Sequence, residues 1–384
     1  MATMFRAPPG ASRHVPAAVA LVLAAMAAVT ACGGASPSPG PEGASPAAAI
    51  QPAVLPTAPP PGPQTLSETG STLLYPLFSA WAPAYKRQFP NVTINIAPTG
   101  STTGISAAAS GKADIGASDA YLSSAKLARY PALENIPLEV SAQMINYNLP
   151  GVTGNLMLDS TVLAGMYQGQ ITRWNDQAIR ALNPGVPLPP LKIIPLHRVE
   201  GSGDTFLFTS YLSKPGSSWA NSISFSNSVA WPPVTGALGE QGNMGMVTGC
   251  EQHPGCVAYI GISYRKQTAG KLGEARLLNS SGNYVLPDKD SISAAADAFA
   301  GITPASGAIS LIDSSSSAAY PIVNYEYAIV STRQPSASKA ATIRALLNWI
   351  LTDGSSPAYL ASVNFEKLPP QVAIIADALI ARIG

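Results

Sequence analysis

Charged side chains are scarce in this sequence, and the scarcity excludes two classes of protein. Asp, Glu, Lys and Arg make up 11% of the 384 residues, whereas about 25% is usual in soluble proteins. The 22 basic residues nearly balance the 21 acidic ones, which leaves a formal net charge of +1. A nucleic-acid-binding protein needs a dense face of Lys and Arg to neutralise phosphates, and a polybasic membrane-surface protein needs a similar cluster. We therefore expect neither nucleic-acid binding nor electrostatic attachment to a membrane.

Histidine is also rare, which argues against an enzyme. The three histidines are His14, His197 and His253. The Gly-x-Ser-x-Gly turn that exposes the nucleophilic serine of many hydrolases does not occur. We therefore predict a protein that is not an enzyme.

Only one long apolar run is present. Val15–Ala31 is interrupted only by Pro16 and follows the basic residues Arg6 and Arg13. Its length is marginal for a bilayer span, and its basic flank predicts a signal peptide over residues 1–31. No later segment stays apolar for about 18 residues without a charge, Gly or Pro, so we expect no other membrane-spanning helix.

The apolar run ends in Val29-Thr30-Ala31-Cys32-Gly33, which resembles a bacterial lipoprotein box. The resemblance implies cleavage before Cys32 and a diacylglycerol on that residue. Two acyl chains anchor a protein stably, whereas one does not. We therefore expect an exported protein that is lipid-anchored to the outer face of the cell membrane.

Proline is abundant, and its distribution predicts a tether. Of the 36 prolines in the chain, 10 lie within residues 33–64. A segment so rich in Pro, Gly and Ala cannot bury enough apolar surface to fold, and proline keeps it extended. Residues 32–64 are therefore predicted to be a disordered spacer.

The two remaining cysteines, Cys250 and Cys256, flank a short loop. In an exported chain such a pair predicts a disulfide. A metal site that also uses His253 is the alternative, but it lacks a fourth ligand at the usual spacing. We predict no metal and no cofactor.

From Leu66 onward, short apolar strands alternate with amphipathic helices, which indicates an α/β fold. Apolar residues at helical spacing predict a helix over residues 72–89. The remaining expected helices cover 101–110, 205–212, 338–351 and 370–382, and the expected strands cover 92–96, 113–117, 192–196 and 322–330.

Three Gly-Ser turns are expected where helices begin: Gly70-Ser71-Thr72, Gly100-Ser101-Thr102 and Gly201-Ser202-Gly203. Unpaired N–H groups and the helix dipole favour an anion at such positions, and a hydroxyl adds a further donor. Helix capping alone explains any single turn. Three turns, with Arg198 just before the third, favour an anion site in a two-lobed solute-binding protein.

Several segments resemble the phosphate-binding protein of the phosphate-specific ABC transporter, especially its actinobacterial lipoprotein members. They include 70–76, Gly116-Ala117-Ser118-Asp119, 197–206, Ile171–Asp176 and Tyr325-Glu326-Tyr327. The resemblance covers about residues 66–384. It implies an extracytoplasmic receptor that binds inorganic phosphate with high affinity and delivers it to the permease subunits of the transporter. We expect it to act as a monomer.

The resemblance also implies a fold with the ligand in a cleft between two α/β lobes. Lobe I comprises residues 65–146 and 325–384, and lobe II comprises 147–324. The two hinge crossings should fall near Gln143–Leu149 and Tyr320–Ala328.

By position, the family's phosphate-binding residues correspond to residues of the three turns and to acids near them. The implied binding residues are Ser71, Thr72, Leu73, Ser101, Asp119, Arg198, Glu200, Ser202, Gly203 and Asp204.

Two of these positions depart from the family pattern. Glu200 stands where many members have Asp, and its extra methylene could displace Arg198 or turn the carboxylate inward. Asp204 stands where other members have Thr. We expect Asp204 to cap the helix with its side chain turned away from the ligand.

Asp119 bears on the choice of anion. Phosphate near neutral pH carries a proton that it can donate to a carboxylate, whereas sulfate carries none and would face like charge. A receptor for sulfate or molybdate is therefore the less favoured alternative. A surface lipoprotein with weak phosphatase activity is the other alternative.

Overall fold

The computed structural model describes residues 53–384, which belong to one compact unit. The predicted signal peptide and Cys32 lie outside the described residues. Among residues 53–384, no helix is both long enough and apolar enough to cross a membrane.

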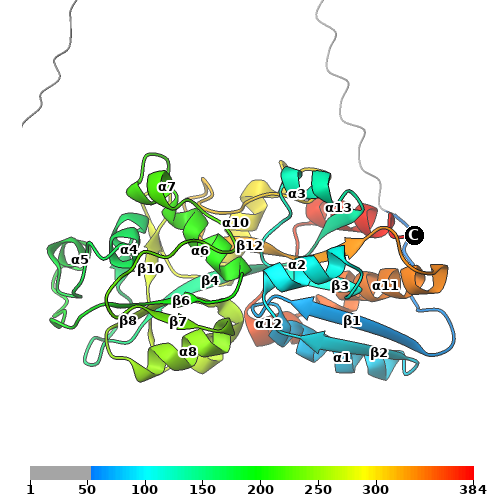
Figure 1. The fold of residues 1–384 in the computed structure, drawn as a ribbon, viewed down its shortest axis with the longest axis horizontal. Helices are drawn as coiled ribbons and strands as arrows, with labels where there is room; N and C mark the ends of the chain where they lie inside the picture. The colour runs from blue at the N-terminus through cyan, green and yellow to red at the C-terminus, as the bar shows by residue number, and fades with distance from the viewer. Residues whose placement is uncertain (1–52) are drawn as a thin grey trace, which may run out of the picture. The chain divides into compact units, whose positions relative to one another are not determined.

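A mixed nine-stranded sheet runs through the unit in the order β2-β1-β3-β12-β4-β8-β6-β7, with β9 beside β4 (Figure 1). Strands β1 to β3 are parallel to one another, and β6 is parallel to both β7 and β8. The antiparallel strands β4 and β12 lie between these two groups. The strands are β1 (Gln64–Gly70), β2 (Val92–Ala97), β3 (Ile115–Ser118), β4 (Leu133–Tyr147), β6 (Ile194–Arg198), β7 (Leu238–Glu240), β8 (Cys256–Gly261), β9 (Gly273–Glu274) and β12 (Val323–Ser331).

Each parallel group carries its own helices, so the sheet supports two lobes. The first lobe contains β1–β3 with α1 (Tyr75–Gln88), α2 (Ser101–Ala109), α3 (Ser124–Arg129), α11 (Ala337–Trp349), η2 (Ile350–Gly354), α12 (Pro357–Val363) and α13 (Pro370–Ile380). The second contains β6–β8 with α4 (Ser160–Tyr167), α5 (Gln177–Leu182), α6 (Gly203–Leu212), α7 (Ser218–Ser222), α8 (Gly242–Gln252), η1 (Ile262–Tyr264) and α9 (Arg265–Thr268). A three-stranded sheet and one more helix complete the described chain: β5 (Met157–Leu158), β10 (Arg276–Leu278), β11 (Tyr284–Val285) and α10 (Lys289–Ala300).

Strand β4 belongs to both groups of strands. Its residues 133–142 pair with β12, whereas Gln143–Tyr147 pair with β8. The strand therefore passes from one lobe to the other near Gln143. The pairing of β12 is irregular between Glu326 and Tyr327, where the register shifts.

Helix α1 shows how local sequence builds the first lobe. Trp81 and Tyr85 lie on its buried face, and the Trp81 Nε1–H donates to the carbonyl of Gly354 at 2.9 Å. Pro76 lies in the first turn, where the missing N–H costs no helical hydrogen bond. Lys86 and Arg87 lie in the last turn, where the helix dipole favours positive charge.

Most predicted elements occur near their expected bounds. Helix α2 and strand β2 begin within one residue of their predicted starts, whereas α6 begins at Gly203 instead of the predicted residue 205. The helix expected from residue 72 begins at Tyr75, because residues 72–74 form a turn. The strand expected over 192–196 is Ile194–Arg198, so Arg198 is its last residue.

The end of the predicted tether is ordered. Residues 54–63 form neither helix nor strand, but Leu55 packs against the core. Asn348 Nδ2–H donates to the carbonyl of Pro56, and Asn91 Nδ2–H donates to those of Pro60 and Gly62. The prediction of disorder up to residue 64 is wrong for this stretch, because these hydrogen bonds and the partly buried Leu55 hold a segment whose composition alone favours disorder.

Candidate functional site

The three Gly-Ser turns lie together between the two lobes. The N–H of Gly100 donates to the carbonyl of Gly70 at 2.7 Å, which joins the first two turns. The N–H of Thr102 donates to the carbonyl of Gly201 at 3.1 Å, which joins the second turn to the third across the lobes. The three turns are therefore neighbours in the structure, as a shared anion site would require.

The first turn presents buried N–H groups. Thr72 and Leu73 are 5% and 0% exposed, and within residues 53–384 their backbone N–H groups have no hydrogen-bond acceptor. Their carbonyls are held from the other lobe, by Tyr264 Oη–H at 3.0 Å and Ser263 Oγ–H at 2.7 Å. A buried N–H without an acceptor costs free energy, so these two groups point to a bound acceptor.

The starts of α2 and α6 add further donors. Ser101 and Gly203 are the first residues of these helices. In the described part of the chain, no acceptor contacts the backbone N–H groups of Ser101, Gly203 or Asp204. N–H groups at a helix start form a ready site for an anion.

Arg198 supplies the positive charge of the site. Its guanidinium is buried, and its Nε–H and Nη2–H donate to Glu200 Oε1 while Nη1–H donates to Asp204 Oδ2 at 2.5 Å. Burial acts to lower the pKa of Arg198, but the charges of Asp204 and Glu200 outweigh it and raise the pKa. Of the five N–H groups of a guanidinium, two remain for a ligand.

Asp119 directly follows β3 and lies next to the hydroxyl groups of Ser71 and Ser101. Its carboxylate accepts hydrogen bonds from Ser71 Oγ–H and, at 3.3 Å, from Ser101 Oγ–H. Burial, together with the nearby charges of Glu326 and Asp204, raises the pKa of Asp119 well above its usual value. Burial also raises the pKa of Glu326, to about 7, despite the hydrogen bonds from Ser141 and Asn324. The two buried carboxyl groups therefore retain protons more readily than exposed ones.

The structure corrects the expectation for Asp204. The N-cap residue of α6 is Ser202, and the cap has no side-chain hydrogen bond. The Asp204 side chain turns toward the site instead, where it pairs with Arg198 and accepts from Asn243 Nδ2–H at 2.9 Å. A buried guanidinium needs a compensating charge, and this requirement outweighs capping here.

Glu200 remains beside Arg198. Its Oε1 accepts from the guanidinium and also from the N–H of Gly242 at 3.1 Å, at the start of α8. The side chain of Glu200 therefore links Arg198 to the start of α8.

All ten predicted binding residues lie in this region, and three other residues that the sequence prediction missed join them. Asn243 donates to Thr72 Oγ1 and Asp204, and Gln143 Nε2–H donates to Asp204 Oδ1 at 3.1 Å. Glu326 faces Asp119. Glu326 could have been identified from the sequence, because it is a charged residue between two tyrosines of a buried strand. Asn243 and Gln143 carried no such signal.

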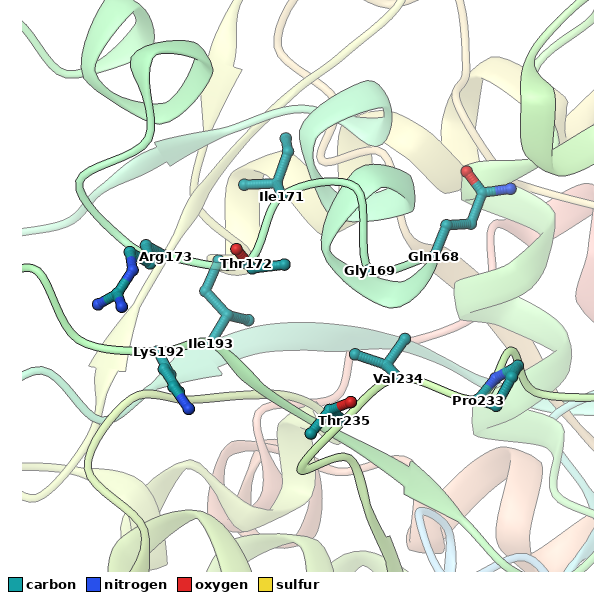
Figure 2. A pocket seen from close by; sticks show the side chains of 10 residues that line it. All are labelled: Gln168, Gly169, Ile171, Thr172, Arg173, Lys192, Ile193, Pro233, Val234 and Thr235. Atoms are coloured by element: carbon teal, nitrogen blue, oxygen red, sulfur yellow. The ribbon is translucent and has the colours of Figure 1, made fainter.

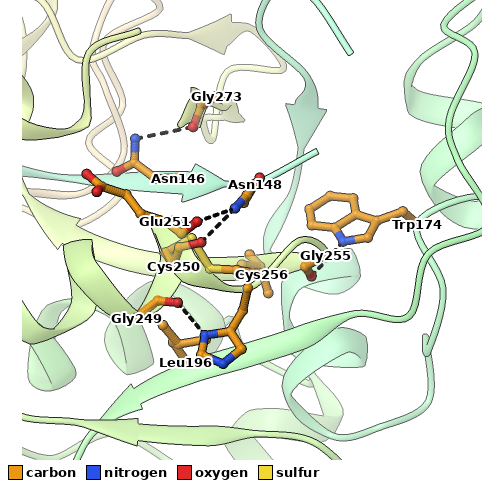
Figure 3. Close-up of a disulfide and its surroundings, with 12 residues drawn as sticks. Asn146, Asn148, Trp174, Leu196, Gly249, Cys250, Glu251, Gly255, Cys256 and Gly273 are labelled. Carbon is orange, nitrogen blue, oxygen red and sulfur yellow. Dashed lines mark hydrogen bonds between the residues drawn. A yellow bond between two sulfur atoms is a disulfide. The ribbon is translucent and has the colours of Figure 1, made fainter. Parts of the chain in front are cut away.

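The cysteines form the predicted disulfide in the second lobe, away from the turns. Cys250 at the end of α8 is bonded to Cys256 at the start of β8, with their Cα atoms 5.3 Å apart (Figure 3). Asn148 Nδ2–H donates to the carbonyls of Cys250 and Glu251. His253 Nδ1 contacts the carbonyl of Gly249 at 2.7 Å. Within residues 53–384, no group of side chains is arranged to hold a metal.

A separate cavity of about 360 Å³ opens on the second lobe (Figure 2). Arg173, Lys192 and Thr235 are among the residues that line it. None of the residues of the three turns lines it, so it is not part of the anion site.

Comparisons with known proteins place the chain among solute-binding proteins. A family model described as a PBP superfamily domain matches residues 55–354. The phosphate-binding protein PstS of Methanocaldococcus jannaschii is 32% identical over 326 residues, which cover 80% of this chain and 83% of that protein. PstS of Xylella fastidiosa is 30% identical over 321 residues, which cover 82% and 86%. The crystal structure of a phosphate-binding protein from Stenotrophomonas maltophilia has a TM-score of 0.62 at 20% identity, over 83% of this chain and 93% of that one.

Proposed function

Because the chain belongs to the PstS family of phosphate-binding proteins, we propose that it binds inorganic phosphate outside the cytoplasm and delivers it to the permease of an ABC transporter. The observation that carries the proposal is that Thr72 and Leu73 are buried and that their N–H groups have no acceptor among the described residues 53–384. The buried Arg198 supplies the charge. Together they provide what a small, desolvated anion needs.

The proposed binding residues come from both lobes. The first lobe contributes backbone N–H groups and hydroxyls, and the second contributes the guanidinium and the start of α6. The proposed set is Ser71, Thr72, Leu73, Ser101, Asp119, Arg198, Glu200, Ser202, Gly203 and Asp204.

Asp119 gives the proposed site its preference for phosphate over sulfate. A phosphate hydroxyl can donate to this carboxylate, whereas a sulfate oxygen would face it without a proton. Sites that hydrogen-bond a substrate hydroxyl can reject analogues lacking it by about 10⁴-fold. This argument also disfavours molybdate.

Binding between two lobes requires motion. Asp119 lies so close to Gly203 that a Cβ built on Gly203 would meet Asp119 Oδ2 at 2.4 Å, so the lobes must part to admit an anion. We place lobe I at residues 65–146 and 325–384, and lobe II at 147–324. The change of partner of β4 at Gln143 supports the first hinge.

The remaining proposals concern the membrane anchor, the oligomeric state and the absence of enzymatic turnover. Cys32 would carry the lipid that keeps the receptor on the outer face of the membrane, and the protein would act as a monomer without enzymatic turnover. Metabolic labelling with a radioactive fatty acid, compared between wild type and Cys32→Ser, tests the anchor. Loss of label in the variant is expected, and equal labelling would contradict it.

Calorimetry on protein stripped of bound phosphate tests the binding function. Phosphate and arsenate should bind far more tightly than sulfate. Arg198→Lys should weaken phosphate binding at least about tenfold, because lysine keeps the charge but loses the planar fork. Arg265→Lys is the matched control, since Arg265 pairs with Glu274 outside the site. A folded protein that binds no phosphate, or binds sulfate equally well, would refute the proposal.

A further inference from the structure

Asn243 is a buried residue whose side chain bonds to both lobes. It is the second residue of α8 and is 0% exposed. Its Oδ1 accepts from the N–H of Gly261 at 2.7 Å, and its Nδ2–H groups donate to Thr72 Oγ1 and Asp204 Oδ2, each at 2.9 Å. Gly261 and Asp204 belong to the second lobe, whereas Thr72 lies between β1 and α1 of the first. The amide therefore joins the two lobes at the first Gly-Ser turn.

These partners fix the orientation of the Asn243 amide. The backbone N–H of Gly261 can only donate, so the amide oxygen has to face it. The two hydrogens of Nδ2 then face Thr72 and Asp204. Turning the amide over would set two donors against each other at Gly261. Asn243 therefore presents a donor to Thr72 and not an acceptor.

The Thr72 hydroxyl accepts two hydrogen bonds from this one residue. Besides Nδ2–H, the backbone N–H of Asn243 donates to Thr72 Oγ1, at 3.3 Å. A hydroxyl has two acceptor sites and one hydrogen, so both acceptor sites are occupied and the hydrogen remains to be donated. Within residues 53–384, no acceptor receives it. The buried N–H groups of Thr72 and Leu73 beside it are in the same position.

We propose that Asn243 is a positioning residue, which makes the Thr72 hydroxyl a dedicated donor to the bound anion when the lobes close. The inference rests on the proposed phosphate-binding function. Asn243 has no donor left for the ligand itself, because its N–H and both Nδ2–H groups are used within the protein. It acts through Thr72, whose hydroxyl is free to rotate while the lobes are apart. Closure then orients the donor, and a donor held in place costs the complex less conformational freedom.

A double-mutant cycle on phosphate affinity, measured by calorimetry on protein stripped of bound phosphate, tests this inference. Thr72→Val keeps the shape of the side chain but removes the hydroxyl. It should raise the dissociation constant for phosphate about 10- to 100-fold, as expected for a hydrogen bond to a charged group. The factor by which Asn243→Ala raises the dissociation constant should be at least about fivefold larger in the wild type than in the Thr72→Val background. An effect that passes through Asp204 is present in both backgrounds and cancels in this comparison.

Asn183→Ala is the matched control for the loss of a buried amide. Asn183 Oδ1 accepts from the N–H of Met157, and its Nδ2–H groups donate to the carbonyls of Met157 and Ile179. Asn183 is 5% exposed, and none of its partners belongs to the three turns. The variant should lower the unfolding temperature and leave the dissociation constant for phosphate within about twofold of the wild type.

The outcomes separate this inference from the proposed function. Equal factors for Asn243→Ala in both backgrounds would show a merely structural role and overturn the inference, as would a Thr72→Val protein that binds phosphate as tightly as the wild type. Either result would leave the proposed function intact, whereas a wild-type protein that binds no phosphate would overturn both. Asn243→Ser takes the place of Asn243→Ala if the alanine variant does not fold, because serine is too short to bond both Gly261 and Thr72.

Discussion

Replacing Gly201 with alanine would place a methyl group where the two lobes touch. A Cβ built on Gly201 lies 2.4 Å from Thr102 Oγ1 and 2.6 Å from Thr102 Cβ. Rotation about χ1 could turn Thr102 Oγ1 aside, but Thr102 Cβ is fixed to the backbone and cannot move away. The N–H of Thr102 also donates to the carbonyl of Gly201. This hydrogen bond holds the two backbones together when the lobes are closed, so they cannot separate here to accommodate the methyl group.

The expected cost follows from overpacking. An inserted methyl group at a close contact typically costs about 1–3 kcal/mol. The clash exists only when the lobes are closed, so the cost should fall on ligand binding. The dissociation constant for phosphate should rise about 5- to 150-fold, while the unfolding temperature should change little.

Calorimetry combined with thermal unfolding measures both quantities. Adding Thr102→Gly to Gly201→Ala removes the clashing side-chain atoms and should restore the affinity toward that of Thr102→Gly alone. Gly301→Ala is the control, since a Cβ there meets nothing within 4 Å. Unchanged affinity in Gly201→Ala, or a loss that Thr102→Gly does not relieve, would show that the bound lobes do not close to this contact.

Three further outcomes are expected. Asp119→Asn should narrow the ratio between phosphate and sulfate affinities, and an unchanged ratio by calorimetry would refute the role given to its carboxylate. Replacing both Cys250 and Cys256 with serine should lower the free energy of unfolding by about 2 kcal/mol, because the disulfide closes only a short loop; urea unfolding measures this, and phosphate affinity should stay nearly constant. Glu68 is buried in β1, and burial raises its pKa from 4.5 to about 8. The unfolded chain therefore releases its proton at lower pH than the folded protein does, so native stability falls as the pH rises from about 4.5 to about 8. Glu68→Gln should stabilise the protein increasingly over that range, and thermal unfolding that shows an equal effect at both ends would contradict this.

The fold class could be predicted because its evidence is local. Alternating apolar residues mark β2, and apolar residues at helical spacing mark α1, so the two-lobed α/β prediction is confirmed. Strand β4 was not predicted as a strand. It is buried on both faces, and Glu139, Ser141, Gln143 and Asn146 lie among its apolar residues, so it shows no alternating pattern.

The site could be predicted only in part, for a related reason. Glycine, serine and arginine in the turns carry a signal in the sequence itself. The direction of the Asp204 side chain depends on Arg198 and Asn243, and the latter comes from α8, a helix that no sequence pattern had indicated. Contacts between distant segments decide such orientations, and neither spacing nor composition encodes them.

Ser263 and Tyr264 donate hydrogen bonds from the second lobe to the carbonyls of Leu73 and Thr72, and neither bond involves the proposed anion. These hydrogen bonds strengthen closure by the same amount whichever ion is enclosed. The strength of capture can therefore be adjusted at these two positions independently of selectivity, which the proposed function assigns to Asp119. A receptor built in this way can adapt to scarce or plentiful supply without relaxing its discrimination between ions.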